Sequence, residues 1–153
     1  MSRSTSSVVL VLSLALASVA SSAPTPKSPP RTSAARSEVA IFAMGCFWCG
    51  ETQFEQQPGV LSVISGFAGG REEHPTYEQV SAGETGHYES VQVTFDPTRT
   101  SYSRMLDLFW HGIDPTQGDG QFCDRGRQYR SVVFVADERQ RKLAEETKHA
   151  IEV

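Results

Sequence analysis

The chain has 153 residues, which suffices for one domain, and its 14 basic and 18 acidic residues give a net charge of -4. The first 37 residues contain four of the basic residues and no acidic one, so the rest has 10 basic against 18 acidic residues. This acidic balance argues against nucleic-acid binding. Three cysteines are too few for a disulfide scaffold, and their odd number indicates at least one functional thiol.

The N-terminal segment has the composition of a targeting sequence. An arginine precedes an apolar run from Val8 to Ala20, which is short for a bilayer span and ends in small residues suited to cleavage. We therefore predict a signal peptide at residues 1–20 and a secreted or periplasmic protein. An uncleaved membrane anchor and an organelle transit peptide are the alternatives. Residues 21–37 hold four prolines among Ser, Thr and Ala, which predicts a disordered linker before a domain at 38–153.

The domain reads as alternating strands and helices, typical of an α+β arrangement in two layers. Apolar runs and period-two alternation predict strands at Glu38–Ala43, Val60–Gly66, Tyr88–Phe95 and Ser131–Val135. Helices are expected after Cys46 and at Tyr77–Ala82, Ser101–His111 and Asp137–Ile151. The stretch Gly66–Gly70 is expected to be a flexible connection. The polar loop Asp114–Arg127 is long for a compact domain, which indicates a function for it.

The segment Gly45–Glu51 holds the residues best suited to chemistry. Cys46 follows a predicted strand and opens a predicted helix, and a thiol reacts as its thiolate, an anion that a helix N-terminus favours. Phe47 and Trp48 put a flat apolar wall beside the sulfur, which suits a small apolar group held against a nucleophile. Cys49 completes the Cys-x-x-Cys spacing that can close a disulfide at a helix start.

A series of short motifs runs in order through the domain. They are Gly45-Cys-Phe-Trp-Cys-Gly-Glu51, Pro58-Gly-Val60, Ser65-Gly-Phe-Ala-Gly-Gly70, Pro75-Thr-Tyr-Glu78, Thr85-Gly-His-Tyr-Glu89, Phe95-Asp-Pro97 and Gln128-Tyr-Arg-Ser131. Together they resemble the peptide methionine sulfoxide reductase A family from about Val39 to the end. The expected fold is an α+β, ferredoxin-like two-layer sandwich with a mixed sheet. Family members usually continue past the helix predicted at 137–151, so the chain is expected to be truncated at its C-terminus.

The resemblance implies an enzyme that reduces methionine-S-sulfoxide, free or in peptides, and so repairs oxidised proteins. Cys46 is implied to attack the sulfoxide sulfur, while Phe47 and Trp48 hold the terminal methyl group. Methionine then leaves, and Cys46 remains as a sulfenic acid, the reversible product of thiol oxidation that a second thiol captures as a disulfide. A thioredoxin-like dithiol is the implied reductant, and no metal or organic cofactor is required.

Four further residues are implied to handle the sulfoxide oxygen. Glu89 is the implied general acid, because that oxygen is a poor leaving group until it is protonated and a partly buried carboxyl has a suitably raised pKa. Tyr77 and Tyr129 match tyrosines whose hydroxyls bind the oxygen, and Asp124 matches an aspartate that orients the substrate. Without the resemblance, Glu89 reads as a solvated strand residue and the other three as ordinary loop residues.

This chain differs from many family members in the thiol that regenerates Cys46. Those members have a small residue in place of Cys49 and recycling cysteines near the C-terminus. Here no cysteine follows Cys123. Cys49, Cys123 or an outside thiol must therefore resolve the Cys46 sulfenic acid, and we favour Cys49 slightly over Cys123. Two other functions remain open, namely a general thiol-disulfide oxidoreductase and a non-catalytic truncated domain that binds oxidised methionine. The expected state is a monomer, and four scattered histidines give little support for a metal site.

Overall fold

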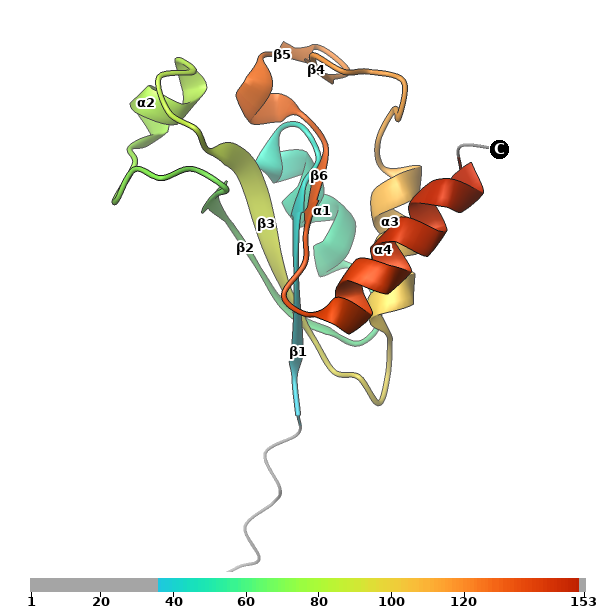
Figure 1. Ribbon diagram of the computed structural model, residues 1–153. Helices are drawn as coiled ribbons and strands as arrows, with labels where there is room; N and C mark the ends of the chain where they lie inside the picture. The colour runs from blue at the N-terminus through green and yellow to red at the C-terminus, as the bar shows by residue number, and fades with distance from the viewer. Residues whose placement is uncertain (1–35, 152–153) are drawn as a thin grey trace, which may run out of the picture. The chain divides into compact units, whose positions relative to one another are not determined.

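The computed structural model describes residues 36–151 (Figure 1). The predicted signal peptide and all but the last two positions of the predicted linker lie outside the described residues. Strands are β1 (Glu38–Ala43), β2 (Val60–Ala68), β3 (Tyr88–Phe95), β4 (Gly120–Gln121), β5 (Asp124–Arg125) and β6 (Val132–Phe134). Helices are α1 (Phe47–Glu55), α2 (Tyr77–Ser81), α3 (Tyr102–His111), the short 3₁₀ turn η1 (Arg127–Tyr129) and α4 (Glu138–Ile151). Within this part of the chain, no helix is long and apolar enough to cross a bilayer.

The main sheet has the strand order β2-β3-β1-β6, and the chain crosses it in the ferredoxin-like manner. The α+β, ferredoxin-like prediction is confirmed. The predicted mixed sheet is wrong for the described strands, because all three neighbouring pairs run antiparallel. The physical reason is the crossover through α1, which sets β1 and β2 apart. The antiparallel strand β3 then fills the space between them and faces an opposite neighbour on each side.

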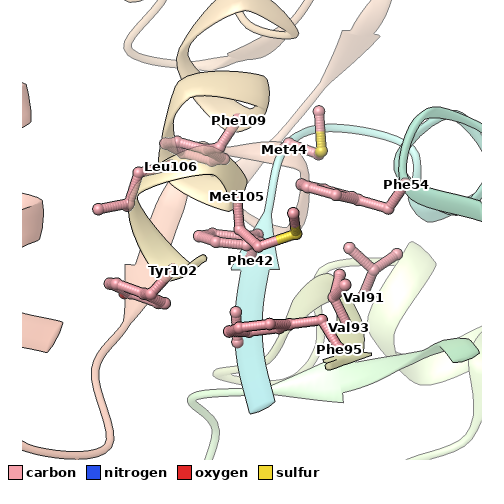
Figure 2. Close-up of a cluster of buried hydrophobic side chains, with 11 residues drawn as sticks. Phe42, Met44, Phe54, Val91, Val93, Phe95, Tyr102, Met105, Leu106 and Phe109 are labelled. Carbon is pink, nitrogen blue, oxygen red and sulfur yellow. The ribbon is translucent and has the colours of Figure 1, made fainter. Parts of the chain in front are cut away.

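The core lies between the sheet and the helices α1 and α3, with Phe42 of β1 at its centre (Figure 2). The Phe42 ring stacks on Phe54, Phe109 and Tyr102 at centroid distances of 5.3, 5.2 and 6.4 Å. From β3, the side chains of Val91, Val93 and Phe95 enter the same cluster and are fully buried. The alternation predicted for this strand is therefore confirmed, and the rigid core fixes the ends of β1 and β3, where the candidate site begins.

Two connections are more ordered than the sequence suggested. Strand β2 continues to Ala68, since its last residues pair with the start of β3 in the register Phe67 to Glu89 and Ala68 to Tyr88. The polar loop predicted at 114–127 contains the β4–β5 hairpin, in which Gln121 pairs with Asp124. Helix α2, this hairpin and the start of α1 gather at one end of the main sheet (Figure 1).

Candidate active site

Cys46 is the N-cap residue of α1, at the predicted strand-to-helix junction. Its carbonyl oxygen accepts hydrogen bonds from the N–H groups of Cys49 and Gly50 at 3.1 and 3.4 Å, which begins the helix. Its side chain makes no capping hydrogen bond and is half-buried, so the thiol is free to react. The sulfur therefore lies at the helix end that carries the partial positive charge of the helix dipole.

Gly45 lets the chain turn sharply into Cys46. Its φ angle of 95° lies in the left-handed region that glycine tolerates best. A Cβ at this position would lie 2.8 Å from Cβ of Gln121, so any side chain would push the β4–β5 hairpin away. Gln121 is fully buried and exchanges two hydrogen bonds, of 2.7 and 2.9 Å, with the backbone of Asp114. The hairpin is thereby fastened against the residue that precedes the thiol.

Phe47 is the centre of an aromatic cluster next to the thiol. Its ring lies 6.0 Å from Trp48, 6.3 Å from Tyr77 and 5.8 Å from Phe67, measured between centroids. Trp48 and Tyr77 remain 66% and 48% exposed, so the cluster offers an apolar surface to an incoming molecule. The sequence did not single out Phe67. Extending the alternation of β2 by two residues would have found it, because Val63, Ser65 and Phe67 share one face of a strand.

Glu89 is 2% exposed at the start of β3, so its interpretation as a solvated strand residue is wrong. One carboxylate oxygen, Oε2, accepts a hydrogen bond of 3.1 Å from the backbone N–H of Phe47. Burial raises the pKa of Glu89 above the usual carboxyl range, although the Phe47 N–H opposes that rise and the charge of Asp124 adds to it. This carboxyl therefore stays protonated to a higher pH than an ordinary carboxyl, and it lies against the first turn of α1.

The remaining polar residues predicted for the site face the same region. Burial raises the pKa of Tyr129, and the charges of Glu89, Tyr77 and Asp124 add to the effect. Such coupling requires Glu89, Tyr77 and Asp124 each to lie near Tyr129, and Asp124 also raises the pKa of Glu89. The four residues come from β3, α2, β5 and η1, segments that are far apart in the sequence. The fold thus gathers Tyr77, Glu89, Asp124 and Tyr129 beside the aromatic cluster.

The three cysteines are free thiols with different surroundings. Cys49 is exposed, yet its pKa is raised. Partial burial is the largest cause, and the charge of Cys46, a hydrogen bond with Cys46 and the charge of Asp124 add to it in that order. Cys49 therefore holds its proton more firmly than an isolated thiol does, and the two sulfurs are neighbours. Cys123 is exposed in the turn between β4 and β5, one residue before Asp124.

Gln128 connects the segments that carry the two tyrosines, and no role was predicted for it. Its side chain is buried, and Nε2 donates a hydrogen bond of 2.8 Å to the carbonyl oxygen of Ser81, at the end of α2. Tyr77 begins that short helix, and Tyr129 follows Gln128 in the chain. No local pattern predicts this contact, because its partners are 47 positions apart.

Other features of the described residues lie outside this arrangement. Buried His87 has its Nδ1 3.3 Å from Oε2 of Glu72. Within residues 36–151, no group of three or more His, Cys, Asp or Glu side chains could hold a metal ion. A groove of about 480 Å³ between α3, α4 and β6 contains none of the predicted site residues.

Comparison with known proteins identifies the family. The family model for peptide methionine sulfoxide reductase matches residues 38–153. The peptide methionine sulfoxide reductases MsrA of Bacillus licheniformis and Halalkalibacterium halodurans are 53% and 54% identical to this chain over 115 and 117 residues. These alignments cover 75% and 76% of this chain, which spans 64% and 66% of the length of those two relatives.

Solved structures agree with the sequence comparison. Methionine sulfoxide reductase A of Corynebacterium diphtheriae superposes with a TM-score of 0.67 at 35% identity, over 76% of this chain and 59% of that one. Reduced Mxr1 from Saccharomyces cerevisiae gives a TM-score of 0.69 at 27% identity, over 76% of this chain and 69% of that one. By sequence and by fold, the chain belongs to the peptide methionine sulfoxide reductase family.

Proposed function

We propose that this chain reduces methionine-S-sulfoxide, free or within oxidised proteins, to methionine. The observation that carries the proposal is the hydrogen bond from the Phe47 N–H to the buried carboxyl of Glu89. It holds a carboxyl of raised pKa beside the helix start that carries the Cys46 thiol. An acid and a nucleophile held together are what a sulfoxide needs, because its sulfur is attacked only as its oxygen is protonated.

The reaction begins when the Cys46 sulfur bonds to the sulfoxide sulfur and Glu89 protonates the oxygen. The new bond between the two sulfurs then breaks, together with the substrate sulfur–oxygen bond, as the protonated oxygen moves to Cys46. Methionine leaves and Cys46 becomes a sulfenic acid, so methionine sulfoxide is reduced and Cys46 is oxidised. A second thiol then attacks Cys46 and expels water as a disulfide forms. A dithiol such as thioredoxin reduces this disulfide and restores the enzyme, without a metal or organic cofactor.

The other residues of the site bind and orient the substrate in this proposal. Phe47 and Trp48 contact the terminal methyl group, whose apolar surface suits their rings. The hydroxyls of Tyr77 and Tyr129 donate to the sulfoxide oxygen, and Asp124 orients the bound molecule. We further propose that the protein acts outside the cytoplasm, because residues 1–20 have the composition of a signal peptide. The proposed state is a monomer.

The direct assay is turnover of racemic methionine sulfoxide, free and in a peptide, with dithiothreitol as reductant. Consumption of the S epimer alone supports the proposal, and absence of turnover by the intact, folded chain would contradict it. A general thiol-disulfide oxidoreductase is the second candidate, favoured by the contact between Cys46 and Cys49. Rapid turnover of a model disulfide together with no sulfoxide reduction would favour that candidate.

The proximity of Cys49 to Cys46 makes Cys49 the proposed first resolving thiol. After one turnover without reductant, we expect the wild-type chain and the Cys123→Ser variant to contain a Cys46–Cys49 disulfide. The Cys49→Ser variant should instead accumulate sulfenic acid at Cys46 or pair it with Cys123. Peptide mapping by mass spectrometry distinguishes these products. A Cys46–Cys123 disulfide in the wild-type chain would reverse the assignment.

Replacing Gln128 with methionine should separate the two tyrosine hydroxyls that must meet one oxygen. We expect kcat/KM to fall by about 10- to 100-fold, because small misplacements of reacting groups lower the rate by such factors. The matched control is Gln140→Met, which removes a similarly buried amide whose Nε2 donates to the Val39 carbonyl at 2.9 Å, away from the site. Gln128→Met leaves the part-buried Ser81 carbonyl without this donor. Gln140→Met does the same to the Val39 carbonyl and also removes the acceptor of the Ala136 N–H, so each variant should lose on the order of 1 kcal/mol of stability or more. Equal kcat/KM in the two variants would show that Gln128 has no positioning role.

A further inference from the structure

The turn between β4 and β5 has an unusual residue at its tip. Gln121 pairs with Asp124, so Phe122 and Cys123 form a two-residue hairpin connection. The φ angle of Phe122 is 52°, in the left-handed region where such turns favour Gly, Asn or Asp. In residues 36–151, His74 is the only other non-glycine residue with a positive φ. A bulky side chain is strained in this conformation, and glycine would relieve the strain.

The side chain of Phe122 is mostly exposed, so little burial offsets this cost. It is 60% exposed, whereas the neighbouring Gln121 is fully buried. The turn itself is fixed, because the Phe122 N–H donates to the side chain of Gln117 and Gln121 is bonded twice to the Asp114 backbone. An aromatic ring is therefore held rigidly towards solvent at a position that penalises it, which indicates a function for the ring.

The hairpin tip lies close to Cys46. A Cβ on Gly45 would lie 2.8 Å from Cβ of Gln121. Gly45 directly precedes Cys46, and Gln121 directly precedes Phe122. With Cα atoms about 3.8 Å apart along the chain, Phe122 lies within about 13 Å of Cys46. An extended peptide covers that distance in about four residues. Asp124, on the other side of the turn, raises the pKa of both Glu89 and Cys49, so the hairpin faces the site.

We propose that Phe122 binds an apolar side chain of a polypeptide substrate, up to about four residues from its methionine sulfoxide. This inference rests on the proposed function. The exposed ring of Trp48 begins the apolar surface at the thiol, and Phe122 extends it along the bound peptide. The enzyme then favours oxidised methionines in unfolded, apolar segments over free methionine sulfoxide.

The test compares Phe122→Gly with the wild-type chain, using dithiothreitol as reductant so that no protein reductant needs to bind. The substrates are free methionine sulfoxide and two matched peptides that flank one methionine sulfoxide with leucines or with serines. We expect the wild-type KM to be about tenfold lower for the leucine peptide, the effect of burying one apolar side chain. Phe122→Gly should remove this preference, leave kinetics on free methionine sulfoxide unchanged, and leave the melting temperature equal or higher.

A matched control is Leu61→Ser, which removes another exposed apolar side chain near the opposite end of β2 from Phe67 and should change no KM value. The inference is overturned if Phe122→Gly keeps the leucine preference, or if it alters free and peptide substrates equally. Peptide binding is followed separately by tryptophan fluorescence. If none of the three substrates turns over but the leucine peptide binds in a manner that depends on Phe122, the proposed function fails, and only the peptide-binding role of Phe122 is retained.

Discussion

The Cys46→Ser variant is expected to lose sulfoxide reduction by on the order of 10⁴-fold or more, with either free or peptide substrate and any reductant. A serine hydroxyl is not ionised at neutral pH and cannot carry the transferred oxygen as a sulfenic acid. Steady-state turnover with dithiothreitol, compared with the wild-type chain, measures the effect. Substantial residual activity would remove Cys46 from the mechanism.

Loss of folding does not explain this expected result. Cys46 makes no side-chain capping hydrogen bond at the start of α1, whereas serine is among the preferred N-cap residues. The variant should therefore be as stable as the wild-type chain, or more stable by up to about 1 kcal/mol. Thermal unfolding of both chains checks this, and an unchanged or raised melting temperature assigns the lost activity to chemistry.

The Glu89→Gln variant is expected to reduce kcat/KM by about 10²- to 10⁴-fold, the usual contribution of a positioned general acid. Glutamine can still accept the Phe47 N–H, so the geometry at the start of α1 is retained while the transferable proton is lost. The control is Glu51→Gln, a motif carboxyl that accepts a hydrogen bond from Ser65 and serves as scaffold. It should stay within a few-fold of wild type, and a similar loss in both variants would contradict the assignment of Glu89.

The raised pKa of Glu89 also predicts the direction in which stability and rate change with pH. Because burial raises the pKa of Glu89, the folded chain holds this proton above the pH at which the unfolded chain loses it. Stability from this group is therefore highest below the ordinary carboxyl pKa and falls as pH rises towards the raised value. The general-acid contribution to the rate should also fall as pH rises through the raised pKa. Glu89→Gln should abolish both trends and unfold at a higher temperature than the wild-type chain at neutral pH.

Local patterns predicted the parts of the fold that depend on local physics. Strands Glu38–Ala43 and Tyr88–Phe95 have the bounds expected from their apolar sequence, since half-buried strands require that alternation. The end of β2 was missed because Gly66 reads as a break, yet pairing with β3 carries the strand to Ala68. Tertiary pairing overrides local preference in this way because its hydrogen bonds come from residues distant in the sequence.

The residues of the site likewise differ in whether local sequence predicts them or distant contacts determine them. Cys46 at a helix start follows from the strand and helix patterns around it, whereas Glu89 is buried and bonded to the backbone of Phe47, 42 positions away. Only the family resemblance brought Glu89 to attention. Gln128 could not be found locally, because its partner is distant. Phe122 contradicts the usual residue preference of its turn, and only the backbone geometry reveals that strain.

The central claim is that Cys46 is oxidised to a sulfenic acid as methionine sulfoxide is reduced, and trapping that sulfenic acid tests it most directly. The double variant Cys49→Ser, Cys123→Ser contains no second thiol, so a sulfenic acid at Cys46 has no internal partner. After one turnover of methionine sulfoxide without reductant, a sulfenic-acid trap should label Cys46 in proportion to the methionine formed, as read by peptide mass spectrometry. Methionine produced in stoichiometric amount with Cys46 remaining an unlabelled thiol would contradict the mechanism.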